Sequence, residues 1–279
     1  MLRKSLTAVA ISLCFATTPL LAEETLPKGN PPVDSPPVDS SPIDSPPAGK
    51  WNSNGTWTFG LIASGGKSIY VGEKNKATVL PYLAFDSERL HFGVDDGLAY
   101  HFLNFGDPQT SGGQLSLVLA PRWETALRKS SIFDGMDRDL PIEGGVRGRY
   151  NAYGFFGEAK ALFDISGVHG GYELEAALGA ERQFGRFGFE AKLGARYRDK
   201  KLNFDLYGVS AAHATATRKQ FTPDASVAGF ASIGARYFMS EDLSLIGNVS
   251  VENIGKMKDS PLVERDHSIF LTIGIMKSF

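Results

Sequence analysis

Apolar and polar side chains alternate along most of the chain after Trp51, and the alternation is most regular between Tyr172 and Arg198. Two segments there, 172–181 and 187–198, carry apolar or small residues at every second position, with charged residues, glycine or one alanine between them. A period of two residues is typical of a β-strand with one apolar face. At about ten residues, each segment could cross a bilayer with its apolar side in lipid and its charges in a lumen.

A two-residue turn at Gly185-Arg186 would join these two segments into a hairpin. In that register Glu175 lies opposite Arg196, and Glu173 lies opposite Arg198. Opposite charges on facing strands stabilise a sheet. The turn and the charges therefore predict the same pairing, with two ion pairs on the lumen side.

The same pattern predicts an all-β fold, an antiparallel transmembrane β-barrel of about twelve strands. The expected strands are 55–64, 77–86, 88–94, 97–105, 112–123, 139–150, 153–163, 170–182, 187–199, 225–238, 242–253 and 267–279. Short connections follow the even-numbered strands, whereas the long ones are 65–76, 124–138, 200–224 and 254–266. Outer-membrane barrels have short periplasmic turns and long external loops, so both termini are expected in the periplasm.

Charged residues on the inward-facing side predict a polar lumen of mixed sign. A second expected turn, Asn151-Ala152, would place Tyr150 opposite Tyr153 and Glu143 opposite Lys160. The lumen candidates are Arg122, Glu143, Arg147, Arg149, Glu158, Lys160, Glu173, Glu175, Lys192, Arg196, Arg198, Arg236 and Glu252. Compensated charges on neighbouring strands favour bracing of a filled barrel over ion conduction, although twelve strands leave both possible.

Composition agrees with a barrel rather than with a helical membrane protein. The 279 residues are 42% hydrophobic, and the mean hydropathy is −0.13. No apolar run of about eighteen residues occurs beyond the N-terminus, which excludes transmembrane helices. The single cysteine, Cys14, lies in the N-terminal segment, so a mature chain would have no disulfide. The net charge is −2, and nothing in the charge pattern indicates a nucleic-acid partner.

The N-terminal residues divide into a signal peptide and a linker. Residues 1–22 carry two basic residues, an apolar stretch and a terminal alanine, as a secretory signal peptide does. Residues 23–50 contain a repeat of the type Pro-Pro-Val-Asp-Ser, which predicts a Pro-rich periplasmic arm of polyproline II conformation. The arm is either a plain spacer or a tether for a periplasmic protein. The barrel is expected to occupy residues 51–279.

The last strand places Ile269, Leu271, Ile273 and Ile275 on one face and ends at Phe279. This terminal aromatic residue resembles the signal that the outer-membrane barrel assembly machinery recognises. Lys277 stands where that signal usually has an aromatic residue. The barrel assembly machinery and outer-membrane lipid are therefore expected partners.

One loop contains the residue types of a serine hydrolase, namely Asp164, Ser166 and His169. A nucleophile needs its serine close to a histidine that a carboxylate orients, and three such residues in one tight loop rarely converge that way. A glycine-rich turn around Asp164 is the simpler interpretation. No catalytic site, cofactor site or metal site is predicted, because the histidines show no ligand spacing.

Four segments resemble the MipA/OmpV family of Gram-negative outer-membrane proteins: 133–138, 164–171, 207–210 and 260–263. Within them the resemblance rests on Gly135, Met136, Arg138, Asp164, Ser166, Gly167, His169, Gly170, Tyr207, Gly208, Val209, Ser210, Ser260 and Pro261. The segments occur in the family's order, and the resemblance spans about 51–279. The Pro-rich repeat departs from the usual family pattern.

The resemblance implies an outer-membrane scaffold that joins a murein hydrolase, a lytic transglycosylase, to a murein synthase. Other members of the family resemble porins or adhesins. A small-solute pore, suggested by the charged lumen, and surface adhesion through the long loops are therefore the alternative functions. The outer membrane is the expected location in each case.

Overall fold

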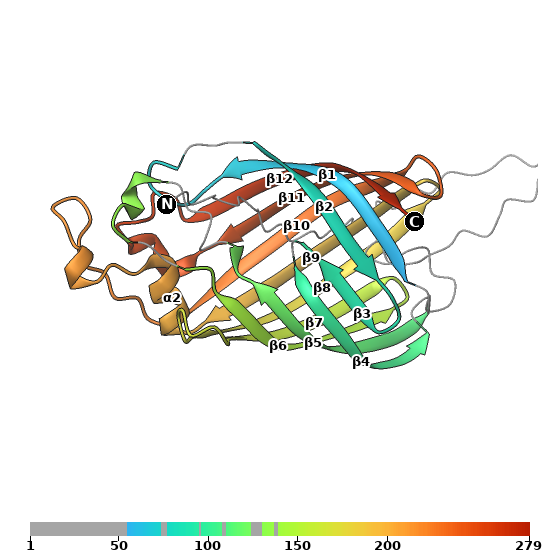
Figure 1. Cartoon of the computed structure of the whole chain (residues 1–279), viewed down its shortest axis with the longest axis horizontal. Helices are drawn as coiled ribbons and strands as arrows, with labels where there is room; N and C mark the ends of the chain where they lie inside the picture. Colours follow the sequence, from blue (N-terminus) through green and yellow to red (C-terminus); the bar gives the residue numbers. More distant parts are fainter. Residues whose placement is uncertain (1–54, 74–76, 95, 108–109, 124–129, 137–138) are drawn as a thin grey trace, which may run out of the picture.

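Twelve antiparallel strands close into a barrel in chain order, with β1 beside β12 (Figure 1). The computed structural model describes residues 55–73, 77–94, 96–107, 110–123, 130–136 and 139–279. The predicted signal peptide, 1–22, and the arm, 23–50, lie outside these ranges. The predicted fold, a twelve-stranded antiparallel barrel, is confirmed.

Most strands are longer than those of soluble sheets, as a membrane-crossing barrel requires. Their bounds are β1 Thr56–Lys67, β2 Thr78–Asp86, β3 Leu90–Gly93, β4 Gly97–Asp107, β5 Ser111–Pro121, β6 Ile142–Ala152, β7 Phe155–Asp164, β8 Tyr172–Phe184, β9 Phe187–Arg198, β10 Ser226–Phe238, β11 Leu243–Asn253 and β12 His267–Ser278. β3 is the exception, with four residues.

The two faces of the sheet differ as the alternation predicts. Outward-facing Leu178 and Leu193 are 74% and 69% exposed, whereas inward-facing Glu175 and Glu190 are 4% and 2% exposed. Outward leucine, isoleucine, valine and phenylalanine side chains continue around the barrel as an apolar belt. A belt of this kind matches the hydrocarbon layer of a bilayer.

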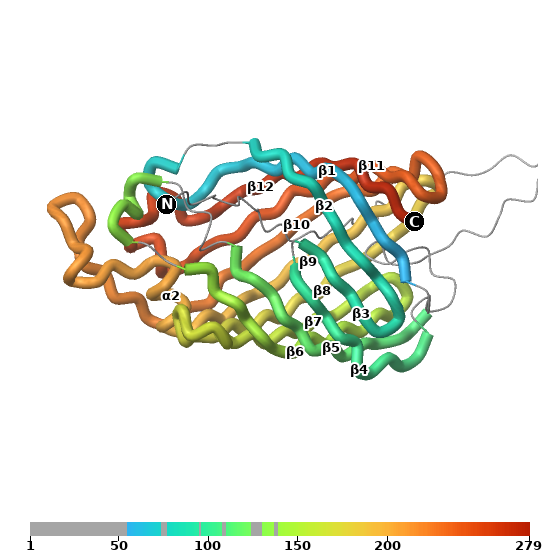
Figure 2. The backbone as a smooth tube through the Cα atoms, viewed as in Figure 1, coloured from blue at the N-terminus to red at the C-terminus, as the bar shows by residue number. Residues whose placement is uncertain are grey.

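The connections lie at two opposite ends of the barrel, except the turn after the short strand β3, which lies partway along the wall (Figure 2). The short connections after β2, β4, β6, β8 and β10 lie at one end, here called the turn end. The described parts of the long connections that follow β1, β5, β9 and β11 lie at the other, here called the loop end. Trp57 and Phe279 close the seam between β1 and β12 at the turn end, through N–H···O bonds of 3.2 and 2.8 Å.

The register of β8 and β9 is the predicted one. Glu175 pairs with Arg196 and Glu173 with Arg198, around the turn Gly185-Arg186. Gly185 has φ +57°, a conformation that glycine adopts without strain.

The register of β6 and β7 corrects the prediction. The turn is Tyr153-Gly154, with φ of +51° and +75°, the type I′ geometry that suits the twist of a hairpin. Lys160 therefore pairs with Arg147, and Glu143 pairs with Asp164, so the predicted pair of Glu143 and Lys160 is wrong. The displacement is an even number of residues, so each side chain stays on its predicted face.

The loop between β9 and β10 contains a helix that the alternation does not indicate, α2 at Lys200–Tyr207. Asp199 begins it by accepting the N–H of Leu202 at 2.9 Å, and Gly208 ends it. Three short 3-10 turns, η1 Ser131–Phe133, η2 Ala211–His213 and η3 Gly255–Asp259, also lie at the loop end. Of the helices in the described ranges, none is long and apolar enough to cross a membrane.

Candidate functional site: an internal ion-pair network beneath a loop cap

The centre of the lumen holds two arginines between three glutamates. Arg196 Nε donates to Glu175 at 2.6 Å, and its Nη1 pairs with Glu252. Arg198 Nε donates to Glu173 at 2.8 Å, and its Nη1 lies 2.7 Å from Glu252. Glu252 thus links the two pairs that the β8–β9 register predicts.

The pairs continue toward the loop end. Arg122 Nε donates to Glu143 at 2.9 Å, and its guanidinium also lies 3.5 Å from Glu173. His169 Nε2 lies 3.3 Å from Glu143 Oε1 with its side chain fully buried. The imidazole of the 165–171 loop therefore lies against Glu143 in the barrel interior, without the geometry of a hydrogen bond.

The pairs also continue toward the turn end. Lys192 Nζ donates to Glu158 at 2.9 Å and lies 3.6 Å from Glu175. Arg147 lies 3.5 Å from Glu158, and Lys160 lies 3.6 Å from Glu175. Lys160 thus pairs with Glu175 near the centre of the lumen, and its neighbour on β6 is Arg147 rather than the predicted Glu143.

These contacts form one connected set, here called the ion-pair network. Its members are Arg122, Glu143, Arg147, Glu158, Lys160, Glu173, Glu175, Lys192, Arg196, Arg198 and Glu252. Its five glutamates face six lysines and arginines, so the charges nearly cancel. Buried charges are costly unless they are paired. A compensated network of this kind joins strands across the lumen and leaves no single-sign lining to select an ion.

Two inward-facing glutamates were missed as lumen candidates. Glu181 and Glu190 are 7% and 2% exposed and face each other across β8 and β9. Arg149 pairs with Glu181 and lies 3.9 Å over the ring of Phe156. Glu181 has the same parity as Glu173, so the alternation already placed it on the polar face.

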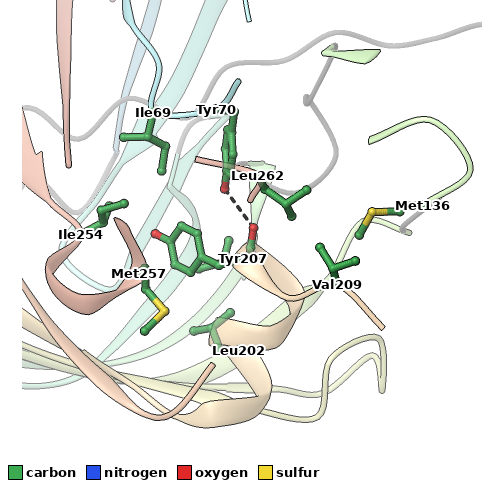
Figure 3. Packing of buried hydrophobic residues seen from close by; sticks show 10 residues of the cluster. Ile69, Tyr70, Met136, Leu202, Tyr207, Val209, Ile254, Met257 and Leu262 are labelled. Carbon is green, nitrogen blue, oxygen red and sulfur yellow. Dashed lines mark hydrogen bonds between the residues drawn. The ribbon is translucent and has the colours of Figure 1, made fainter. Parts of the chain in front are cut away.

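The loop end carries a separate hydrophobic core, here called the cap (Figure 3). Its side chains come from loops that are far apart in the sequence and meet above α2. The buried members are Ile69, Tyr70, Met136, Leu202, Leu206, Tyr207, Val209, Ile254, Met257 and Leu262. The cap packs like the interior of a small soluble domain, which is unusual for loops that connect strands.

Hydrogen bonds tie the loops of the cap together. Tyr70 Oη donates to the carbonyl of Leu206 at 3.4 Å (Figure 3). Ser260 Oγ donates to the carbonyl of Tyr207 at 2.7 Å. Tyr70 also forms an isolated β-bridge with Val263. Three long connections therefore meet at the end of α2.

Arg218 fastens the tip of the β9–β10 loop to the segment before β6. Its Nη1 donates to the carbonyls of Ile132 at 2.6 Å and Asp134 at 3.0 Å. Val209 and Phe221 exchange backbone hydrogen bonds of 2.9 and 3.0 Å at the base of the same loop. The loop is long, but it is held at its base and along its length.

Three of the four segments singled out in the sequence meet in the cap. Met136, Tyr207, Val209 and Ser260 are buried there. Gly208 donates its N–H to the Phe204 carbonyl, Ser210 Oγ contacts His213 Nδ1 at 3.0 Å, Gly135 has φ +75°, and Pro261 adjoins Leu262. Arg138 lies outside the described residues.

The fourth segment is a turn organised by Asp164. Its carboxylate accepts N–H groups from Ser166, Gly167, His169 and Gly170 at 2.6–3.0 Å. Burial alone would raise the pKa of Asp164, but the hydrogen bonds from Gly170, Ser166 and His169 outweigh it and hold the pKa below its usual range. The carboxylate thus fixes the backbone of the loop.

The hydroxyl and the imidazole of this turn point to different partners. Ser166 Oγ donates to Asp164 at 2.7 Å. His169 Nδ1 accepts the N–H of Gly171 at 2.9 Å, which leaves Nε2 to face Glu143. Within the ranges that the structure describes, no three His, Cys, Asp or Glu side chains gather as a metal ion would need.

Comparison with solved structures finds bacterial membrane proteins at low identity. A bacterial polysaccharide outer-membrane secretin is 9% identical, over 80% of this chain and 98% of that chain, with a TM-score of 0.42. The CymD monoaromatic hydrocarbon channel is 12% identical, over 82% and 89%, with a TM-score of 0.35. The toluene transporter TodX of Pseudomonas putida is 12% identical, over 86% and 95%, with a TM-score of 0.34. Likenesses this distant carry no conclusion about what this chain binds or transports.

No curated protein matches the chain in sequence. The sequence model of one family, described as "MltA-interacting protein MipA", matches residues 59–279, which is the barrel from its first strand to its last residue. With well over half of its length matched, this outer-membrane β-barrel belongs to the MipA family.

Proposed function

We propose that this outer-membrane barrel is a scaffold that holds a murein hydrolase and a murein synthase together at the cell envelope. The observation that carries the proposal is the ion-pair network beneath the cap. Paired charges join Arg122, directly after β5, with strands β6 to β9 and β11 across the lumen. The cap gathers the long loops at one end. Such a barrel suits a rigid anchor better than an open channel.

The turn end is the face that we assign to the partners. Both termini would then lie in the periplasm, where the murein enzymes act. This end presents the exposed side chain of Tyr153, at 78%, together with Arg186 and the pair of Lys277 and Asp242. The arm 23–50 would add a tether beside this surface. The family's description names one partner, MltA, for the protein that it describes.

A capture experiment tests the scaffold. The purified barrel, embedded in membrane and carrying an affinity tag, should enrich a murein hydrolase and a murein synthase from a periplasmic extract. Tyr153→Asn should weaken capture, because asparagine tolerates the positive φ of the turn but removes the exposed ring. His213→Ala at the loop end is the matched control and should capture as wild type. No enrichment over an unrelated barrel would remove the proposal.

Conduction is the competing function, because the lumen is charged. Planar-bilayer recordings should show no current steps above leak, while a known porin conducts in the same preparation. Steady steps from the wild-type barrel would replace the scaffold with a small-solute pore.

A further inference from the structure

The methionines of this chain differ sharply in their exposure to solvent. Met136 and Met257 are 5% and 3% exposed in the cap, and Met276 is 5% exposed in the barrel interior. Met239, by contrast, is 42% exposed. It lies in the turn between β10 and β11, at the turn end of the barrel. Met1 lies outside the described residues, so Met239 is the exposed thioether of the part that the structure describes.

The buried methionines have enclosed sulfur atoms. Met136 and Met257 belong to the hydrophobic core of the cap. Met276 packs with Ile62, and its Sδ would be in direct contact with a Cβ added to Gly60. An oxygen atom on any of these sulfurs would be a polar group in an apolar core, which is costly without a hydrogen-bond partner. Oxidation at these positions would therefore require local opening of the structure.

The turn around Met239 is fixed by hydrogen bonds and surrounded by polar side chains. The N–H groups of Met239 and Ser240 donate to the carbonyl of Leu243 at 2.9 and 3.2 Å. Ser240 Oγ donates to Asp242 at 2.7 Å. Ser240, Glu241 and Asp242 are exposed, as expected of a turn that meets water rather than hydrocarbon. The side chain of Met239 is thus presented to solvent from a fixed backbone.

The neighbouring hairpin supports the same turn. Arg186 Nη1 donates to the Met239 carbonyl at 3.3 Å, and the Phe238 N–H donates to the Arg186 carbonyl at 2.9 Å. Oxidation of a methionine makes its flexible apolar side chain polar. At position 239 the added oxygen would lie at a solvated surface beside a cation. The change would make this part of the turn end more polar without disturbing a core.

We propose that Met239 is a reversible oxidation site, which hydrogen peroxide or a similar two-electron oxidant converts to methionine sulfoxide. The thioether sulfur attacks one peroxide oxygen, so an S–O bond forms as the O–O bond breaks. The departing hydroxide takes the proton of the transferred hydroxyl and becomes water. The sulfur is oxidised by two electrons, and the peroxide is reduced by them. The chemistry of this site does not depend on the scaffold function.

The reverse step needs a methionine sulfoxide reductase and a thiol reductant. Two thiols are oxidised to a disulfide, the S–O bond breaks, and the oxygen leaves as water. A reductase must reach the sulfoxide, and the exposure of Met239 permits this in the folded barrel. The buried methionines would again require local opening.

Peptide mass spectrometry tests the site in the folded barrel. Wild type in phosphatidylcholine vesicles is treated with limiting hydrogen peroxide, and the gain of one oxygen atom is followed at each methionine. Met239 should be oxidised roughly tenfold faster than the three buried methionines, because susceptibility follows exposure. Met239→Leu should remove the fast phase, whereas Met136→Leu, the matched buried control, should keep it. Both variants conserve apolar volume, and heat-modifiable mobility checks their folding.

The same treatment of the urea-unfolded chain separates exposure from local sequence. Without the fold, the four methionines should react at similar rates. Equal rates in the folded barrel, or the same preference for Met239 in urea, would overturn the inference.

Reversibility is tested on the oxidised barrel. Methionine sulfoxide reductases for both sulfoxide epimers, with dithiothreitol, should return the folded barrel to its original mass. Its heat-modifiable mobility should be the same before oxidation, after oxidation and after reduction. Persistence of the sulfoxide in the folded barrel, while the corresponding free peptide is reduced, would also overturn the inference.

Discussion

Arg196 shows how one side chain can hold several strands of this barrel together. It bonds to Glu175 on β8 and to Glu252 on β11, and its guanidinium lies 4.3 Å over the ring of Phe230 on β10. A buried pair adds little net stability by itself, but removal of one partner leaves an uncompensated charge. Charge reversal at this position should therefore disturb contacts on four neighbouring strands.

Arg196→Glu should lower the free energy of unfolding by roughly 3–5 kcal/mol, because it leaves Glu175 and Glu252 facing a third carboxylate. The outward neighbour offers the control, since Ala195→Ser should change stability by about 0.5 kcal/mol or less. Glu175→Arg in the same chain should restore only part of the loss, because Glu252 would still face a carboxylate at position 196. The folded fraction in urea, read from heat-modifiable gel mobility, measures all three. Equal stability of the two single variants would contradict the network.

Leu193, one residue before Gly194 on β9, faces the bilayer at 69% exposure. Leu193→Arg should cost about 2–4 kcal/mol of folding free energy, because it places a cation in hydrocarbon. Ala195→Ser on the same face again serves as the mild control in the gel assay. If Leu193→Arg folds as wild type while Lys192→Leu does not, the two faces have been assigned the wrong way round.

The loop of Asp164 should depend on pH in a defined direction. The folded-state pKa lies below the ordinary aspartate value of 3.8, so the charged form stabilises the turn. That stabilisation is fully present above pH 3.8 and is lost as the pH falls through the depressed value. The amide resonances of Gly167 and Gly170 should stay in place down to about pH 4 and shift only in stronger acid. Asp164→Asn should show the shifted positions already at pH 7, and a midpoint above 3.8 would refute the assignment.

Among the strands, the sequence predicts a register well where charge and turn chemistry point to one answer. Around Gly185-Arg186, two opposite-charge pairs and a glycine turn agree, and the predicted pairing of β8 and β9 is confirmed. Around β6 and β7 the alternation allows any displacement by an even number of residues. The turn is Tyr153-Gly154, with Tyr153 at φ +51°. The sequence does not indicate that a tyrosine adopts a positive φ, so it does not predict this turn.

The cap shows what the alternation cannot predict. Its contacts join loops by tertiary packing, and no period in the sequence relates Tyr70 to Leu206 or Leu262. The helix α2 did leave a local signal, because Asp199 and Gly208 bracket it as cap residues. An eight-residue helix inside a long loop is too short for a clear 3.6-residue pattern. The resemblance to a family picked out the loop residues, but not the fact that they pack together.

Leu206→Ala should open the cap without unfolding the barrel. Leu206 is 1% exposed, and a buried leucine-to-alanine change typically costs 2–5 kcal/mol. Arg218, which is 8% exposed and hydrogen-bonded in the wild type, should then become a trypsin site, while the barrel keeps its heat-modifiable mobility. Leu178→Ala on the outer face is the matched control and should leave Arg218 protected. Equal cleavage of both variants would show that packing of the cap does not protect this loop from trypsin.

At the scale of the whole molecule, the barrel depends on the seam between its first and last strands. Gly66 on β1 lies against β12, where a Cβ would approach the Phe270 Cα to 2.8 Å and meet the Ile269 carbonyl oxygen. These are backbone atoms, which cannot rotate away as a side chain could. Ten residue pairs hold this seam, and the barrel closes only if they form.

Gly66→Val should therefore reduce the yield of closed barrel, with a destabilisation of about 1–3 kcal/mol or more from overpacking. Valine is a good strand residue, so the effect would not come from strand propensity. Gly229→Val on β10 is the matched control, because nothing lies within 4 Å of the added Cβ there. Normal heat-modifiable mobility of Gly66→Val would show that the seam accommodates the added side chain.

The cap has a consequence for the order in which the chain folds. Its side chains are carried by the loops after β1, β5, β9 and β11, so they meet only when strands from both ends of the sequence have taken their places. Contacts between such distant residues form late, because loop closure comes before them. During refolding, resistance of Arg218 to trypsin should accordingly appear after the heat-modifiable band. Formation of the cap would then mark the completion of the barrel.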